Sequence, residues 1–190
     1  MYKILVAIPH IGKLDAGLVT WLMSFDKMGH KIEMFLSEDR PIPSNRNRII
    51  KKFLETDNDY LMMVDSDITP PKNILAILNS NKEIISPMCF VMKDVDKITN
   101  AVNKVKREYK VITEFDKGIN EVDAVGTGCI FIKRNIIEKM KKPLFKYKYN
   151  KEGILSNGED FNFCDNAKKE GFKIFYDTRY IVNHRTTTIL

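Results

Sequence analysis

The chain has 190 residues, of which 44% are hydrophobic and 29% are charged. That length and balance predict a single globular domain over residues 1–190 with its own hydrophobic core, and they exclude a disordered chain. No apolar run reaches the roughly 18–20 residues that cross a membrane, so we expect no transmembrane helix. The formal net charge of +6 suits a phosphorylated ligand, a nucleic acid or an anionic lipid, or lysines that only serve solubility.

The cysteines indicate a reducing environment. Cys89, Cys129 and Cys164 are an odd number, widely spaced, and lack the spacing of a zinc site. Each lies in an apolar stretch, so we expect reduced thiols in the core. The segment 1–12 is typical of a buried first strand rather than a signal peptide. We therefore expect a cytoplasmic protein.

The first half of the chain alternates between strand and helix patterns. Apolar runs predict strands at 3–8, 32–36, 60–64 and 83–86, and one-sided apolar patterns predict helices at 14–28, 46–56 and 72–79. Ser44 or Asn45 is placed to cap the second helix, and Pro70-Pro71 opens the third. The alternation predicts an α/β fold with a Rossmann-like, mostly parallel sheet flanked by helices. Ligands of such sheets bind beyond the carboxyl ends of the strands.

The second half has a less regular pattern. It predicts strands at 108–114, 121–132, 173–176 and 180–183, helices at 134–141 and 160–170, and a loop at 142–158. In the last helix we expect Phe161, Cys164 and Ala167 to face the core. Within the loop, aromatic residues alternate with lysines, and we predict that 143–157 is a lid that orders over a bound ligand.

The most informative motif is Asp65-Ser66-Asp67, directly after the apolar strand at 60–64. In an extended chain, residues i and i+2 point to the same side, so Asp65 and Asp67 can converge. Two carboxylates about 4 Å apart repel by about 4 kcal/mol at an effective dielectric near 20, and a divalent cation relieves that repulsion. Mg²⁺ and Mn²⁺ prefer such carboxylates together with phosphate oxygens. The alternative is a polar turn that leads into the next helix.

Other motifs are weaker when taken singly. Gly126 and Gly128 interrupt an apolar strand, which indicates close approach by a ligand or a bulge. Glu159 and Asp160 begin a helix, where carboxylates are stabilised by the helix dipole and Asp is also a common cap.

Two further side chains have a candidate role in binding a ligand. His184 follows the last predicted strand and can serve as a metal ligand. Arg46, in the first turn of a predicted helix, can contact a diphosphate or remain solvated.

Taken in order, these motifs resemble the GT-A glycosyltransferases, especially glycosyltransferase family 2 and its small relatives. The resemblance rests on five segments: Ile8-Pro9, Arg46-Asn47, Leu61 to Asp67, Val122 to Arg134, and Gly158-Glu159-Asp160-Phe161 followed by His184. It covers nearly the whole chain. It implies a metal-dependent transfer of a sugar from a nucleotide-diphosphate sugar, with a UDP- or GDP-sugar as the favoured donor and Mn²⁺ or Mg²⁺ as cofactor.

The resemblance also implies individual roles. The metal ligands would be Asp65, Asp67 and His184, and the donor site would be lined by Pro9, Arg46, Asp65 and Ser66. Asp160 would be the general base of an inverting reaction. The sugar and the acceptor would lie near Gly126, Gly128 and Glu159. One departure is His10-Ile11-Gly12, where family members often carry an asparagine, so the contacts to the base stay open.

Three alternatives remain. A nucleotidyltransferase can have the same fold, but such enzymes usually carry a glycine-rich basic loop after the first strand, and residues 8–12 have one glycine and no arginine. A non-catalytic nucleotide-sugar binder is the second. Nucleic-acid binding, the third alternative, is not expected, because the basic residues are dispersed and no recognition motif is present.

The class of acceptor is open and can be a glycan, a lipid or a protein. The lysine-rich segment 139–151 is a candidate contact with a membrane surface or a partner.

Overall fold

The structure is a computed structural model that describes residues 1–93, 96–106 and 108–185. Its first half contains, in chain order, β1 (Lys3–His10), α1 (Ala16–Ser24), β2 (Lys31–Glu38), α2 (Ile42–Leu54), β3 (Tyr60–Val64), β4 (Ile68–Thr69), the 3₁₀ helix η1 (Ile74–Ser80) and β5 (Ile84–Lys93). The strands predicted in this half are all present.

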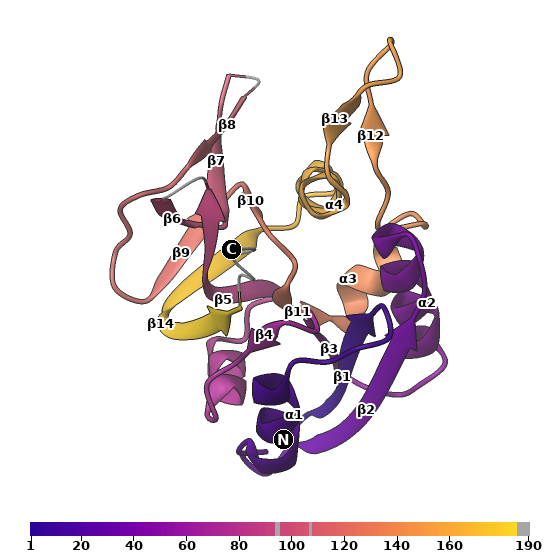
Figure 1. The fold of residues 1–190 in the computed structure, drawn as a ribbon, viewed down its shortest axis with the longest axis vertical. Coiled ribbons are helices and arrows are strands. Elements are labelled where there is room, and N and C mark those ends of the chain that lie inside the picture. The colour runs from indigo at the N-terminus through magenta and orange to yellow at the C-terminus, as the bar shows by residue number, and fades with distance from the viewer. Residues whose placement is uncertain (94–95, 107, 186–190) are drawn as a thin grey trace.

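The second half contains, in chain order, β6 (Asp96–Thr99), β7 (Ala101–Val105), β8 (Glu108–Val111), β9 (Ile119–Val122), β10 (Ala124–Val125), β11 (Cys129–Lys133), α3 (Arg134–Lys139), β12 (Lys148–Tyr149), β13 (Leu155–Asn157), α4 (Glu159–Lys169) and β14 (Ile174–His184). Two hairpins, β7–β8 and β12–β13, project from the same end of the molecule (Figure 1). None of the helices that the structure describes is both long and apolar enough to cross a membrane.

The central sheet has the strand order β2-β1-β3-β11-β5-β14-β4. Strand β1 pairs in parallel with β2 and β3, and β14 pairs in parallel with β5. Strand β11 lies between β3 and β5 and is antiparallel to both. The prediction of an α/β fold with a mostly parallel sheet is confirmed. Because β3 and β14 run in the same direction, the residues that follow them meet at one edge of the sheet.

Both faces of the sheet are covered, which explains its continuous apolar strands. Along β1, Leu5 and Ala7 join a core shared with α2, α3 and α4. The alternate residues Ile4, Val6 and Ile8 join the core under α1 and η1. This alternation follows from the two-residue period of a strand. The three cysteines are buried free thiols, as expected, and burial raises the pKa of Cys89 to about 12.

The start of α2 differs from the prediction. The helix begins at Ile42, with Pro41 at the N-cap position, rather than after a cap by Ser44 or Asn45. Pro43 lies in the first turn, where the missing N–H has no cost, so the helix extends one turn further back. Instead of capping, the Ser44 hydroxyl donates to Asp39, and the buried Asn45 amide donates to the carbonyl of His10 at 3.1 Å.

Three other expectations in the second half were wrong. The predicted loop 142–158 contains the hairpin β12–β13. In α4, Cys164 and Ala167 are buried as expected, whereas Phe163 takes the core position expected for Phe161, which is only partly buried and packs beside Tyr109. The segments 173–176 and 180–183 form one strand, β14, whose pairing with β5 shifts register between Asp177 and Ile181. The buried Asp177 carboxylate holds this irregular stretch by accepting hydrogen bonds from the backbone and guanidinium of Arg179.

Tyr176 fixes β14 to β5 at the centre of the second half. Its buried hydroxyl accepts a hydrogen bond from the Cys89 backbone N–H at 2.8 Å and lies 3.0 Å from the Asn100 side-chain oxygen. Asn100 in turn lies against the backbone of Gly126. The hydroxyl therefore joins two strands to the glycine-containing segment.

We expect Tyr176→Phe to lower the free energy of unfolding by about 1–3 kcal/mol, because a buried N–H loses its acceptor. Chemical denaturation measures the change. Tyr149→Phe, at an exposed tyrosine in β12, is the matched control and is expected to leave stability unchanged. Equal stability of the two variants would contradict the role of this hydroxyl.

Candidate functional site

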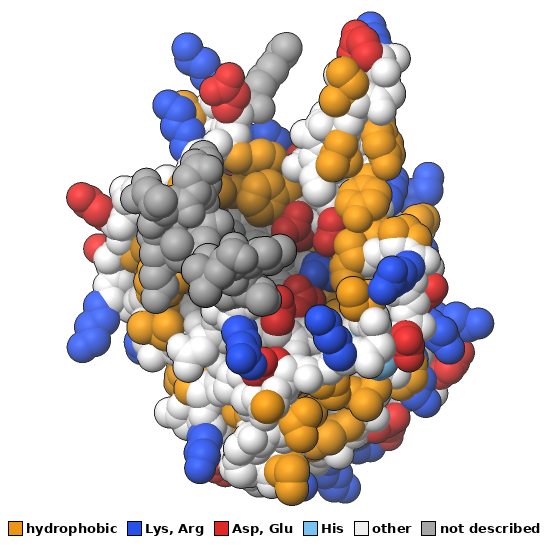
Figure 2. Space-filling view, viewed as in Figure 1, with side chains coloured by type: hydrophobic (Ala, Val, Ile, Leu, Met, Phe, Trp, Pro, Cys, Tyr) orange, Lys and Arg blue, Asp and Glu red, His pale blue; other side chains and the backbone are white. Residues whose placement is uncertain are grey.

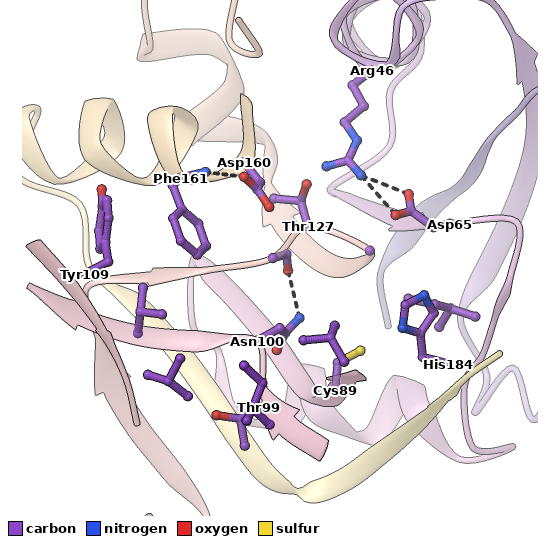
Figure 3. Close-up of a pocket in the computed structure, with 17 residues that line it drawn as sticks. Arg46, Asp65, Cys89, Thr99, Asn100, Tyr109, Thr127, Asp160, Phe161 and His184 are labelled. Atoms are coloured by element: carbon purple, nitrogen blue, oxygen red, sulfur yellow. Dashed lines mark hydrogen bonds and ion pairs between the residues drawn. The ribbon is translucent and has the colours of Figure 1, made fainter. Parts of the chain in front are cut away.

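A cavity at the carboxyl edge of the sheet brings together six of the ten predicted site residues (Figure 3): Arg46, Asp65, Gly126, Gly128, Asp160 and His184. The cavity has a volume of about 420 Å³. Its polar lining comprises Arg46, Asp65, Thr99, Asn100, Thr127, Asp160 and His184. On the surface, acidic side chains gather in a hollow beneath the two projecting hairpins (Figure 2). Residues from both halves of the chain therefore share one site.

Arg46 occupies the centre of the polar lining. Its guanidinium is 5% exposed and donates from Nη2 to both carboxylate oxygens of Asp65, each at 3.0 Å. Its Nη1 lies 3.7 Å from the Glu159 carboxylate, which is 13% exposed. The guanidinium thus joins α2, the end of β3 and the start of α4. The two carboxylates are held with their remaining lone pairs available to a ligand's hydroxyl groups.

Asp67 and His184 form a second pair. Antiparallel pairing of β14 with β4 sets His184 opposite Ile68, and this register brings the imidazole beside Asp67. The distance from His184 Nε2 to Asp67 Oδ2 is 3.4 Å. The Asp67 carboxylate raises the pKa of His184, and the imidazole lowers the pKa of Asp67. The two side chains can attract a cation when the imidazole is neutral.

The ligand atoms of Asp67 and His184 are of types that bind a divalent metal. The Asp67 side chain is 51% exposed, and a carboxylate oxygen and an imidazole nitrogen that face each other are ligands that Mn²⁺ accepts. Asp65 faces Arg46 instead, and the described part of the chain holds no group of three acidic, histidine or cysteine side chains that converge. The assignments of Asp65, Asp67 and His184 to a metal all stay predictions, and Asp67 and His184 are the two of these side chains that the structure brings together.

Asp160 lies apart from His184 in the cavity, next to Phe161 (Figure 3). Gly158 is the N-cap of α4, so Asp160 is in the first turn rather than the cap. One of its oxygens accepts from the Phe161 N–H at 2.7 Å. Burial raises the pKa of Asp160, and the adjacent Glu159 carboxylate raises it further. A raised pKa makes this carboxylate a stronger proton acceptor.

The glycines at 126 and 128 make room for side chains of the protein itself. A Cβ on Gly128 would lie 2.6 Å from Ile68 Cδ1 and 3.1 Å from an Asp65 oxygen. A Cβ on Gly126 would lie 3.0 Å from the Asn100 amide. Both glycines also line the cavity. Gly128 allows the segment to approach Asp65 closely, and Gly126 allows it to approach Asn100.

The sequence analysis did not single out Thr127. This side chain is 1% exposed, lines the cavity, and its hydroxyl has no hydrogen-bond partner among the described residues. A buried hydroxyl without a partner in the protein is a candidate contact for a ligand. Its signal in the sequence was a hydroxyl residue between two glycines.

The remaining predicted donor residues, Pro9 and Ser66, do not line this cavity. Pro9 is buried within β1. Ser66 lines a separate hollow of about 260 Å³ together with Lys13, Asp67 and Arg185. Arg185 pairs with Asp15, the N-cap residue of α1. Asp15 also lines the hollow, so of the two cationic side chains next to Asp67, Arg185 is paired with a carboxylate and Lys13 is not among the ion pairs of the described residues.

No protein-family model matches the chain, and no curated protein matches it. Solved structures do. The crystal structure of A197 from STIV superposes with a TM-score of 0.66 at 22% identity, covering 97% of this chain and 86% of that chain. GalNAc-T7, crystallised with UDP, GalNAc and Mn²⁺, gives 0.67 at 10% identity over 97% of this chain, which spans 44% of that chain.

A third structure comes from a different class of enzyme. The inositol-1-phosphate CTP transferase from T. maritima gives a TM-score of 0.54 at 11% identity, covering 97% of this chain and 89% of that chain. The chain therefore has the GT-A-like fold that glycosyltransferases and nucleotidyltransferases share, as the sequence analysis predicted.

We expect Arg46→Met to lower the free energy of unfolding by about 1–3 kcal/mol, because Asp65 and Glu159 lose their shared partner. The loss is limited by the solvent that reaches Asp65, which is 29% exposed. Thermal and urea denaturation measure it. Arg48→Met, on the exposed face of the same helix, is the control, and an effect no larger at position 46 would argue against the central role of this guanidinium.

Proposed function

We propose that the protein is a metal-dependent glycosyltransferase that moves a sugar from a nucleotide-diphosphate sugar to an acceptor hydroxyl. The observation that carries the proposal is the half-buried Asp160 carboxylate, with its raised pKa, in the same cavity as the Arg46–Asp65 pair and His184. This combination provides a proton acceptor, hydrogen-bonding groups for a sugar, and a place for cationic charge.

The donor's diphosphate is proposed to lie between Asp67 and the hollow lined by Lys13 and Arg185. A Mn²⁺ or Mg²⁺ ion held by Asp67 and His184 would neutralise charge on the departing diphosphate. The presence of UDP and Mn²⁺ in the GalNAc-T7 structure supports a UDP-sugar and this metal as the first to test. Ser66 and Pro9 would border the nucleotide.

The transferred sugar is proposed to lie in the cavity. Asp65, fixed by Arg46, would accept hydrogen bonds from its hydroxyl groups, and the Thr127 hydroxyl would contribute another contact. Asp160 would take the proton of the acceptor hydroxyl as that oxygen bonds to the anomeric carbon. The bond from this carbon to the phosphate oxygen breaks with its electron pair remaining on the nucleoside diphosphate. Attack opposite the leaving group inverts the anomeric centre.

Two other functions belong to the same fold. A nucleotidyltransferase would join a sugar phosphate to a nucleoside triphosphate, and the triphosphate would release pyrophosphate. A non-catalytic protein would bind nucleotide-sugars without turnover.

We further propose that the protein acts in the cytoplasm as a single domain. The lysine-rich segment 139–151 is the proposed contact for a membrane surface or a partner protein.

The proposal is tested by incubation with a panel of UDP- and GDP-sugars plus Mn²⁺ or Mg²⁺, with release of nucleoside diphosphate as the readout. We expect slow hydrolysis of one donor, abolished by excess EDTA. Asp67→Ala should abolish it with the fold intact, because the cation loses a ligand, whereas the exposed Asp116→Ala should not. Donor hydrolysis at the full rate in excess EDTA would contradict the metal-dependent mechanism. Release of pyrophosphate from a nucleoside triphosphate would instead favour a nucleotidyltransferase.

Asp160→Asn should lower kcat by about 10²–10⁴-fold with donor affinity nearly unchanged, because the amide cannot accept the proton.

The pH dependence of the rate tests the same assignment. In the wild type, the rate should fall as the pH drops through the pKa of Asp160, and because that pKa is raised, the fall should lie above the ordinary value of 3.8. Glu159→Gln removes the neighbouring charge that helps raise this pKa, so the loss should move to lower pH. A pH–rate profile unchanged by Glu159→Gln would contradict the assignment of the acidic limb to Asp160.

A further inference from the structure

The cavity has two chemically different ends. Arg46, Asp65 and His184 lie at one end, and Asp160 lies between the ends (Figure 3). Tyr109 and Phe161 lie at the other end (Figure 3). Val102 belongs to the core cluster against which Tyr109, Val111 and Phe161 pack, and Val91 and Ile98 are further apolar side chains of the cavity lining. The cavity therefore has apolar side chains from β5, β6, β7, β8 and α4 beside its polar groups.

The β7–β8 hairpin and α4 build the apolar end. Val102 and Val111 are direct partners in the β7–β8 register, so their side chains lie on the same face. The rings of Tyr109 and Phe161 lie 4.8 Å apart at 51°. Phe161 directly follows Asp160, so the apolar wall begins beside the proposed base.

Two polar side chains near this end, Thr99 and Asn100, are already paired within the protein, whereas the buried Tyr109 hydroxyl has no hydrogen-bond partner among the described residues. The Thr99 hydroxyl donates to the Ile112 carbonyl at 2.7 Å. The Asn100 oxygen lies 3.0 Å from the Tyr176 hydroxyl, and its amide lies 3.4 Å from the Gly126 carbonyl. A polyhydroxylated molecule would lose water here without gaining equivalent partners, which disfavours it.

We propose that this end is the acceptor compartment, and that the acceptor presents its hydroxyl on an apolar alkyl or aryl body. This inference rests on the proposed function. The acceptor oxygen bonds to the anomeric carbon, its proton passes to Asp160, and the bond to the phosphate oxygen breaks to release the nucleoside diphosphate. The apolar body packs against Val102, Val111 and Phe161, and each methylene buried there strengthens binding by about fourfold.

Cyclohexanol and myo-inositol are matched probes, because both present secondary hydroxyls on a six-carbon ring and differ in polarity. With the donor that the wild type hydrolyses best, mass spectrometry measures glycoside formed from each alcohol against free sugar released by water. We expect cyclohexanol to give at least about tenfold more glycoside than inositol at equal concentration. Equal or greater transfer to inositol would overturn the proposal.

Variants test where the selectivity arises. Val102→Thr and Val111→Thr each replace a methyl group in the compartment by a hydroxyl and should lower the ratio of cyclohexyl glycoside to free sugar about fourfold. Val19→Thr, at a 40% exposed position on α1, is the control and should keep the wild-type ratio. Because the measure is a ratio, partial loss of folded protein does not change it. Two compartment variants with the wild-type ratio would refute the location.

A binding measurement separates this inference from the proposed function. Saturation-transfer NMR should detect cyclohexanol but not inositol on the wild type without any donor, with a weaker signal in Val102→Thr. If the protein turns over no donor, the glycosyltransferase proposal fails, but the NMR result still shows whether the apolar end binds an apolar alcohol. An equal cyclohexanol signal in wild type and Val102→Thr would show that the apolar end does not bind it.

Discussion

The buried guanidinium of Arg46 is the interaction on which the site depends. It comes from α2, in the regular α/β half, and it contacts Asp65 after β3 and Glu159 at the start of α4. A buried cation is stable only when its charge is compensated, so the two carboxylates must remain in place around it. The position of α4 relative to the sheet, and with it the position of Asp160, is tied to this constraint.

Strand β14 supplies the other part of the site. It pairs in parallel with β5 and, beyond its irregular stretch, in antiparallel with β4. This path carries the chain back to the edge where β3 ends, so His184 reaches Asp67 although 117 positions separate them in the chain. The Tyr176 hydroxyl and the Asp177–Arg179 contacts fix the same strand. The geometry of the cavity therefore rests on long-range pairing rather than on any one motif.

Local patterns in the sequence were enough to predict the regular half of the fold. The predicted bounds of the strand at 60–64 match those of β3, because a continuous apolar run that stops at two carboxylates marks both ends of a buried strand. The pairing of Asp67 with His184 followed from the order of motifs. The start of α2 was misplaced because proline in its first turn competes with side-chain caps as a signal. Thr127 and the apolar wall were not identified, because the burial of a hydroxyl depends on the packing around it, and because the strand at 101–105 that pairs Val102 with Val111 was not predicted.

The central claim is that a divalent metal and a nucleotide bind together at the edge where β3 and β14 end. Paramagnetic broadening of backbone amide signals by Mn²⁺, recorded with and without UDP, tests it most directly. We expect broadening that is centred on 65–68 and 184–185, is strengthened by UDP, is absent from the tip of the β12–β13 hairpin, and is lost in His184→Ala. Broadening centred elsewhere, or unchanged in that variant, would contradict it.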